Sequence, residues 1–221
     1  MRLINKFIVG CFLSALWAGP GPAFAGDIRD DIIQAIKMDD AREVSTQLGR
    51  GADPNMTDEE GTSLLMLAVR EGSSQAAEVL LQAGAKVNTT NAYGDSALLM
   101  AALAGNEKLV TSLLDRGAQV GRNRLGWTPL MYAAFNGHEK VVAILLGAGS
   151  DIDASSNGGM TALMVAAMNG HEHVVEQLLA RGARSELRNA GGLTAADLAE
   201  EKGNTDIAGL IRKKGLGQKG Q

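Results

Sequence analysis

The hydrophobic pattern of residues 126–153 predicts two short helices joined by a turn. Thr128 is a suitable N-cap and Pro129 a suitable first helical residue, and the apolar residues that follow recur at helical spacing. Gly137 is expected to end this first helix in the left-handed conformation. The second helix carries one apolar stripe, made of Val141, Val142, Leu145 and Leu146. Such a unit cannot cover its own apolar face, so it requires neighbours.

The same pattern recurs along the chain with a period near 33 residues. Glycines before the first helices and after the second helices form two series with spacings of 33 or 32, namely Gly61, Gly94, Gly126, Gly159 and Gly192, and Gly51, Gly84, Gly117, Gly149 and Gly182. Both series lose one residue at the same place, which predicts a single deletion between Gly117 and Gly126. This period, with Thr-Pro-Leu-x-x-Ala-Ala and Gly-His inside it, resembles the ankyrin repeat. Tetratricopeptide repeats share the two-helix unit, but their tryptophan and tyrosine pattern is missing.

The resemblance covers roughly residues 28–213 and implies an all-α fold, an ankyrin-repeat solenoid of stacked helix-turn-helix units with β-hairpin-like loops. We expect one domain over 26–214, and a flexible tail over the Gly-, Gln- and Lys-rich residues 215–221. The expected repeats are 27–57, 58–90, 91–122, 123–155, 156–188 and 189–214. The first and last depart from the repeat pattern and carry polar residues, as terminal caps require.

Residues 1–25 read as a cleaved secretory signal rather than as part of the fold. Arg2 and Lys6 precede an apolar run of about 11 residues, too short to span a bilayer, and Ala23-Phe24-Ala25 is a small-x-small cleavage site. Cleavage after Ala25 predicts a periplasmic protein, with secretion as a further option. A rival reading is that Ile8-Val9-Gly10-Cys11 is a lipobox, which implies a lipid-anchored scaffold.

Charge and cysteine content narrow the possible functions. The chain has 21 Lys+Arg against 25 Asp+Glu, and removal of Arg2 and Lys6 with the signal leaves 19 − 25 = −6. A mildly acidic chain gives no reason to expect nucleic-acid binding. Cys11 is the only cysteine, so the processed chain has no disulfide and no thiol chemistry. With no membrane span expected, the prediction is a monomer that binds a protein.

No residue pattern points to catalysis, a metal or a cofactor, and the chain is predicted not to be an enzyme. His138 and His171 occupy the Gly-His position of the repeats, where the resemblance implies a structural histidine. His173 lies two residues after His171, so their side chains point about 200° apart on a helix and cannot easily share a metal ion. Asp151 and Asp153 match turn positions, and the rest of a calcium-binding loop is absent.

In ankyrin proteins, positions around the framework glycine usually project into a concave groove, and the resemblance carries this role to matching residues here. The predicted partner-binding residues are Tyr93, Leu103, Arg122, Arg124, Leu125, Trp127, Phe135, Asn136, Met160, Met168 and Asn169. The groove is expected to be acidic at its N-terminal end and apolar at its centre. Met164, Met131 and Leu99 are expected to extend this surface. A rival reading is that Trp127 and Phe135 serve the stack rather than a ligand.

The leading hypothesis is a protein-binding module of the cell envelope, acting as an immunity or inhibitor protein or as a helper of an envelope enzyme. Exposed aromatic and methionine side chains suit an adaptable contact surface. An alternative is protection against oxidants, either through surface methionines or together with a peroxide-detoxifying enzyme. Its motive is the nine methionines of the chain, eight of which remain after Met1 is removed.

Overall fold

The computed structural model describes residues 25–218, with side chains described for 28–215. Residues 1–24 of the predicted signal peptide, Cys11 among them, and the last three residues therefore lie outside the described part. Between residues 25 and 218 the chain forms twelve α-helices: α2 (Ala25–Lys37), α3 (Ala41–Gly49), α4 (Leu64–Arg70), α5 (Ser74–Gln82), α6 (Ala97–Ala104), α7 (Glu107–Asp115), α8 (Pro129–Phe135), α9 (Glu139–Gly147), α10 (Ala162–Met168), α11 (Glu172–Ala180), α12 (Ala195–Glu201) and α13 (Thr205–Gln218).

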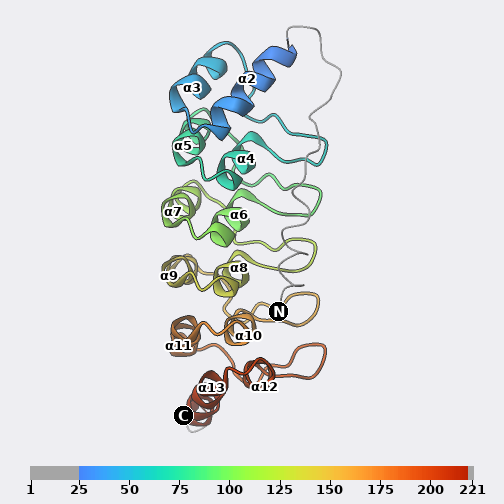
Figure 1. The fold of residues 1–221 in the computed structure, drawn as a ribbon, viewed down its shortest axis with the longest axis vertical. Helices are drawn as coiled ribbons and strands as arrows, with labels where there is room; N and C mark the ends of the chain where they lie inside the picture. Colours follow the sequence, from blue (N-terminus) through green and yellow to red (C-terminus); the bar gives the residue numbers. More distant parts are fainter. Residues whose placement is uncertain (1–24, 219–221) are drawn as a thin grey trace.

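The helices stack in two columns, and hairpin-shaped loops project from one side (Figure 1). First helices α4, α6, α8, α10 and α12 form the column next to the loops, and second helices α5, α7, α9, α11 and α13 form the other. Antiparallel bridges join Thr57 to Ser63 and Thr90 to Ser96 at the base of two loops. The predicted solenoid of helical hairpins with β-hairpin-like loops is confirmed. No helix among residues 25–218 is long and apolar enough to cross a bilayer.

Each first helix begins at a hydroxyl side chain in the same register. The residue before the helix is extended, and its oxygen accepts the backbone N–H three residues on, which satisfies one unpaired donor of the helix start. These N-caps are Ser63, Ser96, Thr128, Thr161 and Thr194. Their spacings of 33, 32, 33 and 33 repeat those of the glycines, so one sequence signal fixes every first helix.

The core runs the length of the stack rather than forming one centre. Alanine pairs such as Ala133 with Ala134 and Ala166 with Ala167 are fully buried on the first helices, where small side chains let neighbouring helices approach closely. Larger residues such as Leu145 and Leu178 fill the space between first and second helices. Each repeat therefore buries its apolar face mainly against its neighbours, as in other solenoids.

The two ends carry the polar surfaces that were predicted for them. In the last repeat Ile207 and Ile211 are buried, while Arg212 is exposed and pairs with Asp197 and Glu200. At the other end Asp30, Gln34, Lys37 and Arg42 are exposed, and Asp31 is half-buried. The last helix continues to Gln218, so it ends later than the boundary predicted at residue 214.

One contact between repeats is missing next to the deletion inferred from the glycine series. At two boundaries Asn55 and Asn88 accept the backbone N–H of Lys86 and Gln119, and Asp153 does the same for Arg184 further on. Gly121 stands at the equivalent position in between and has no side-chain acceptor. The guanidinium of Arg122 instead donates to the Ser155 carbonyl across this boundary, at 3.4 Å.

Asp39 is the non-glycine residue with positive φ, +52°, among the described residues. Glycines hold the equivalent turn positions of later repeats, including Gly72 and Gly105. Aspartate tolerates this conformation better than most residues because its side chain bonds locally. Its Oδ1 accepts the Ala76 N–H at 2.9 Å, so it caps the start of α5 in the next repeat. Asp39 thus adopts a less favourable backbone conformation than glycine would, and its side chain forms a bond between repeats.

We predict that Asp39→Ala lowers the free energy of unfolding by about 1–2 kcal/mol, the usual effect of losing an N-cap. Asp39→Asn is the matched control, since it keeps an acceptor oxygen and tolerates positive φ. Urea denaturation followed by circular dichroism measures both variants. Equal stability of Asp39→Ala and wild type would show that the bond to Ala76 contributes nothing.

Candidate protein-binding surface

Each hairpin loop is organised by one polar side chain three residues before its framework glycine. The residues at this position are Asp58, Asn91, Asn123, Ser156 and Asn189. The side-chain oxygen accepts backbone N–H groups two and four residues on, or only the latter at the serine, at 2.7–3.2 Å. These residues were not predicted from the sequence, although their spacing matches that of the glycines. They make the loops rigid supports.

Backbone hydrogen bonds join the hairpin tips of successive repeats. The N–H of Arg124 donates to the carbonyl of Tyr93 at 3.0 Å, and the N–H of Asn157 donates to that of Leu125 at 3.0 Å. Equivalent bonds join Ala92 to Glu60 and Ala190 to Gly158. The side chains of Tyr93 and Leu125 are 46% and 64% exposed, although they are large and apolar. Two apolar residues are thus held on adjacent, hydrogen-bonded tips.

Gly126 shows why the loops need glycine at this point. Its φ is +78°, and a Cβ there would lie 2.7 Å from the backbone nitrogen of Asn157 in the next repeat. Any side chain would therefore both strain the turn and separate the tips. At this boundary between repeats, glycine is therefore a condition for the bond between the tips.

Three aromatic rings pack together where the hairpin of residues 123–127 meets α8. The ring centroid of Trp127 lies 5.0 Å from that of Tyr132, with the planes tilted by 47°. It lies 5.9 Å from that of Phe135 in an edge-on arrangement. All three residues are partly exposed. We call Trp127, Tyr132 and Phe135 the aromatic cluster. The inner surface is the face of the stack that this cluster forms together with the hairpin tips and the exposed residues of the first helices.

Asn123 connects the aromatic cluster to the preceding repeat. Its Oδ1 accepts the N–H groups of Leu125 and Trp127, and its Nδ2 donates to Asp95 at 2.9 Å and to the Tyr132 hydroxyl at 3.1 Å. Both polar atoms of this buried amide are therefore satisfied. Burial raises the pKa of Tyr132, and the nearby Asp95 charge raises it further, while the bond from Asn123 opposes the shift. The hydroxyl stays protonated at neutral pH.

The structure brings four of the predicted site residues close to one another and gives others a packing role. Trp127 and Phe135 are in ring contact, and Tyr93 and Leu125 lie on adjacent tips. The Asn136 amide donates to the carbonyl of Leu103, which joins two repeats.

The remaining predicted residues lie outside the aromatic cluster. Met160 and Met168 are half-buried, and Asn169 donates to Val165 within its own repeat. Arg124 is exposed at a tip. Arg122 lines a separate pocket beside Asn88 and Gln119, to which no residue of the aromatic cluster contributes.

Three residues expected to extend this surface are instead in the core. Leu99, Met131 and Met164 are 3%, 0% and 1% exposed. The prediction was wrong because the position three residues after the N-cap, which all three occupy, is buried within the stack. Tyr132, which was not among the predicted groove residues, lies in the aromatic cluster.

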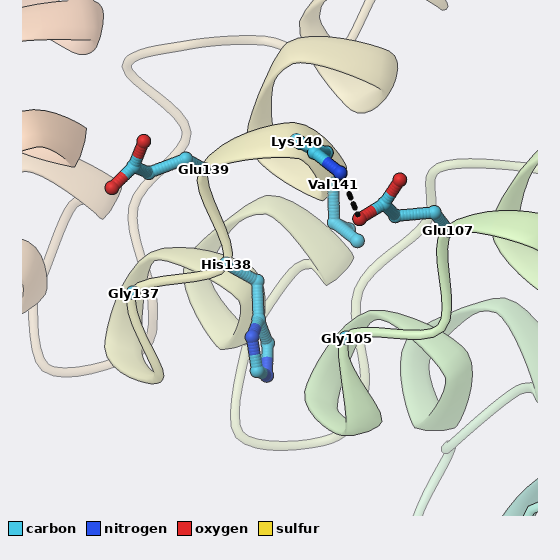
Figure 2. Close-up of a pocket in the computed structure, with 7 residues that line it drawn as sticks. All are labelled: Gly105, Glu107, Gly137, His138, Glu139, Lys140 and Val141. Carbon is cyan, nitrogen blue, oxygen red and sulfur yellow. Dashed lines mark ion pairs between the residues drawn. The ribbon is translucent and has the colours of Figure 1, made fainter.

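The histidines of the Gly-His pairs bond between repeats, as a structural role requires. His138 Nε2 lies 3.1 Å from the Leu103 carbonyl, and His171 Nε2 lies 2.8 Å from that of Phe135. Figure 2 shows the His138 ring beside Gly105, in a pocket that also contains the 3.3 Å ion pair between Lys140 and Glu107. Within residues 25–218 no three or more His, Cys, Asp or Glu side chains group as metal ligands would.

We predict that Asn123→Ala lowers the free energy of unfolding by about 2 kcal/mol or more, because buried partners lose their hydrogen bonds. Asn91→Ala is the matched control, since Asn91 accepts the two loop N–H groups but makes no described bond to an aspartate or tyrosine. The difference between the two variants in urea denaturation measures the links to Asp95 and Tyr132. Equal effects would mean that these links add no stability.

We predict that Tyr132 ionises with a midpoint above pH 10 when absorbance is titrated in a Tyr93→Phe background. Adding Asp95→Asn lowers the midpoint without restoring it fully, because burial is the larger cause. A pKa raised in the folded state gives stability that is intact below the unfolded value near 10 and is lost as the pH rises through the folded value. A midpoint at or below 10 would contradict the buried hydroxyl.

Comparison with known proteins agrees with this architecture. No curated protein matches the chain. The family model described as ankyrin repeats (3 copies) matches residues 32–124, 93–156 and 130–219. These matches overlap and together span nearly the whole stack. The chain therefore belongs to the ankyrin repeat family, whose repeats typically serve as non-enzymatic domains that bind protein partners.

Proposed function

We propose that this protein acts outside the cytoplasm and binds another protein through its inner surface. The observation that carries the proposal is the exposure of Tyr93 and Leu125 on bonded tips next to the aromatic cluster. Aromatic side chains are enriched at the centres of interfaces, where they bury much apolar area at little entropic cost. Rigid tips lower the cost of ordering on binding further.

The stack itself does not require these aromatic residues. The positions equivalent to Trp127 hold Thr62, Asp95, Met160 and Leu193 in other repeats. The position equivalent to Phe135 is Arg70 in one repeat and Leu103 in the next. Since the repeats stack with such different residues there, Trp127 and Phe135 are better explained by a ligand than by packing.

The location outside the cytoplasm is supported by the charged start, apolar run and small-x-small site of residues 1–25. In that compartment a rigid binding module suits an immunity or inhibitor protein, or a helper of an envelope enzyme. Mass spectrometry of the N-terminus tests the location: a chain beginning at Gly26 supports export with cleavage. An N-terminal lipid on Cys11 would instead support an anchored scaffold.

Protection against oxidants through methionines gains little support from the fold. Met66, Met131 and Met164 are at most 1% exposed, so their sulfurs cannot meet peroxide while the stack is folded. Met38 is 79% exposed in the turn after α2, and Met56, Met100, Met160 and Met168 are half-buried. The inner surface is therefore the better guide to function.

We predict that the double variant Trp127→Ala, Phe135→Ala weakens capture of the partner from a cell-envelope fraction by about thirtyfold, as loss of about 2 kcal/mol implies. Lys140→Ala, on the exposed side of α9, is the control and is expected to capture the partner normally. Circular dichroism confirms that both variants are folded. Undiminished capture by the folded double variant would remove the inner surface as the binding site.

A further inference from the structure

We infer that the partner binds the inner surface with a polyproline II segment, placing an apolar residue on the aromatic cluster and basic residues about six positions away over Glu59 and Glu60. This inference rests on the proposed function and adds the chemistry of the partner. It follows from the polar groups around the rings, the spacing of the repeats and the charge along the surface.

Hydrogen-bonding groups surround the aromatic cluster. No described residue accepts a hydrogen bond from the Trp127 indole N–H, and the Tyr132 hydroxyl accepts from Asn123 but donates to no described residue. Asn136 and Asn169 donate their amide N–H groups to carbonyls of the helices, which leaves their Oδ1 atoms as acceptors. Both asparagines are exposed. The rings thus lie among both donors and acceptors.

These groups favour an extended partner over a helical one. A helix satisfies its backbone N–H and C=O groups internally, so it offers such a surface only side chains. A polyproline II segment makes no internal hydrogen bonds, and its carbonyl groups are free to accept from Trp127 and Tyr132. Proline rings also pack well on aromatic side chains, and their fixed conformation lowers the entropic cost of binding.

The spacing of the repeats matches this conformation. Neighbouring helices pack about 8–10 Å apart, so equivalent positions recur along the inner surface at about that distance. A polyproline II helix turns once every three residues and rises about 3.1 Å per residue, so it presents the same side about every 9 Å. In a β-strand, residues three apart point to opposite sides. Only the polyproline II segment places every third residue on a successive repeat.

The charges along the inner surface indicate where the basic residues of the partner segment lie relative to its apolar residue. Glu59 and Glu60 occupy the tip two repeats before Trp127, and Arg124 lies at the tip next to it. Two repeats correspond to about six residues of a polyproline II segment. Basic residues are therefore favoured over the acidic tip and disfavoured beside Arg124, because complementary potentials align at interfaces.

The test uses fluorescein-labelled twelve-residue peptides made otherwise of proline. The first has lysine at its second and third positions and leucine at its sixth and ninth, and the same sequence in reverse order covers both chain directions. A matched control moves the sixth-position leucine to the seventh, which is strand spacing. A helical alanine-based peptide with leucines seven residues apart represents the other binding mode. Fluorescence anisotropy measures the binding of each peptide to the protein purified in its processed form.

We expect one of the two chain directions to bind, and the strand-spaced control to bind about tenfold more weakly, the effect of exposing one leucine again. The double variant Glu59→Lys, Glu60→Lys is expected to weaken binding about fivefold, as for exposed ion pairs. A peptide with glutamate in place of lysine should then bind this variant better than it binds wild type. Leu125→Ser, at an exposed tip, gives a surface variant that leaves the stack folded.

Failure of this inference is distinguishable from failure of the proposed function. If the helical peptide binds and the proline peptides do not, or if spacing and charge reversal have no effect, the polyproline II mode is overturned. Loss of partner capture in Trp127→Ala, Phe135→Ala would still support the inner surface in that case. If Leu125→Ser and the aromatic variant leave both peptide binding and partner capture unchanged, both proposals fall.

Discussion

The structure depends on contact between neighbouring repeats, because no single hairpin of helices can bury its own apolar face. The first helices meet through small residues such as Ala133 and Ala134, while the larger residues of the second helices close the space behind them. Polar contacts then fix how each repeat sits on the next. Side chains such as His138 and His171 donate to carbonyls at the ends of preceding helices, and backbone bonds join the hairpin tips. Stability in such a stack is a sum over neighbours.

The sequence predicted the fold well because most of this contact is written in a short repeating pattern. Glycines, N-caps and apolar stripes recur at one spacing, and each has a local physical reason to be where it is. The pattern did not predict the bonds between repeats at positions where the residue type differs from one repeat to the next. Asp39 stands where later repeats have glycine, and it caps α5. Asn204 stands at the position of His171, and its amide donates to the carbonyls of Ala167 and Met168. The positions of these residues follow the repeat spacing, but the atoms that they bond in the neighbouring repeat are seen only in the structure.

The binding surface was predicted less well, and the reason is geometric. Sequence register identifies which positions recur, but it does not say how deep a side chain lies between two helices. Met164 and Met168 are one helical turn apart, yet the first is buried and the second half-exposed. Tyr132 is the opposite case: Val165 holds the equivalent position in the next repeat and is fully buried, whereas the larger tyrosine reaches Trp127 and Asn123. Side-chain size thus decides which repeat contributes to the surface.

A division of labour between positions explains how one fold combines rigidity with a variable surface. Residues that bond or pack between repeats are constrained by the neighbouring repeat. A Cβ at Gly126 would collide with Asn157, and the Asn123 amide donates to Asp95. Leu125 joins the ladder of tips through its backbone carbonyl, so the ladder does not fix the identity of its side chain. A tip can therefore change its side chain without weakening the stack. Two adjacent tips of this stack carry large, exposed apolar residues, Tyr93 and Leu125, and exposed apolar surface of this kind is typical of contact sites.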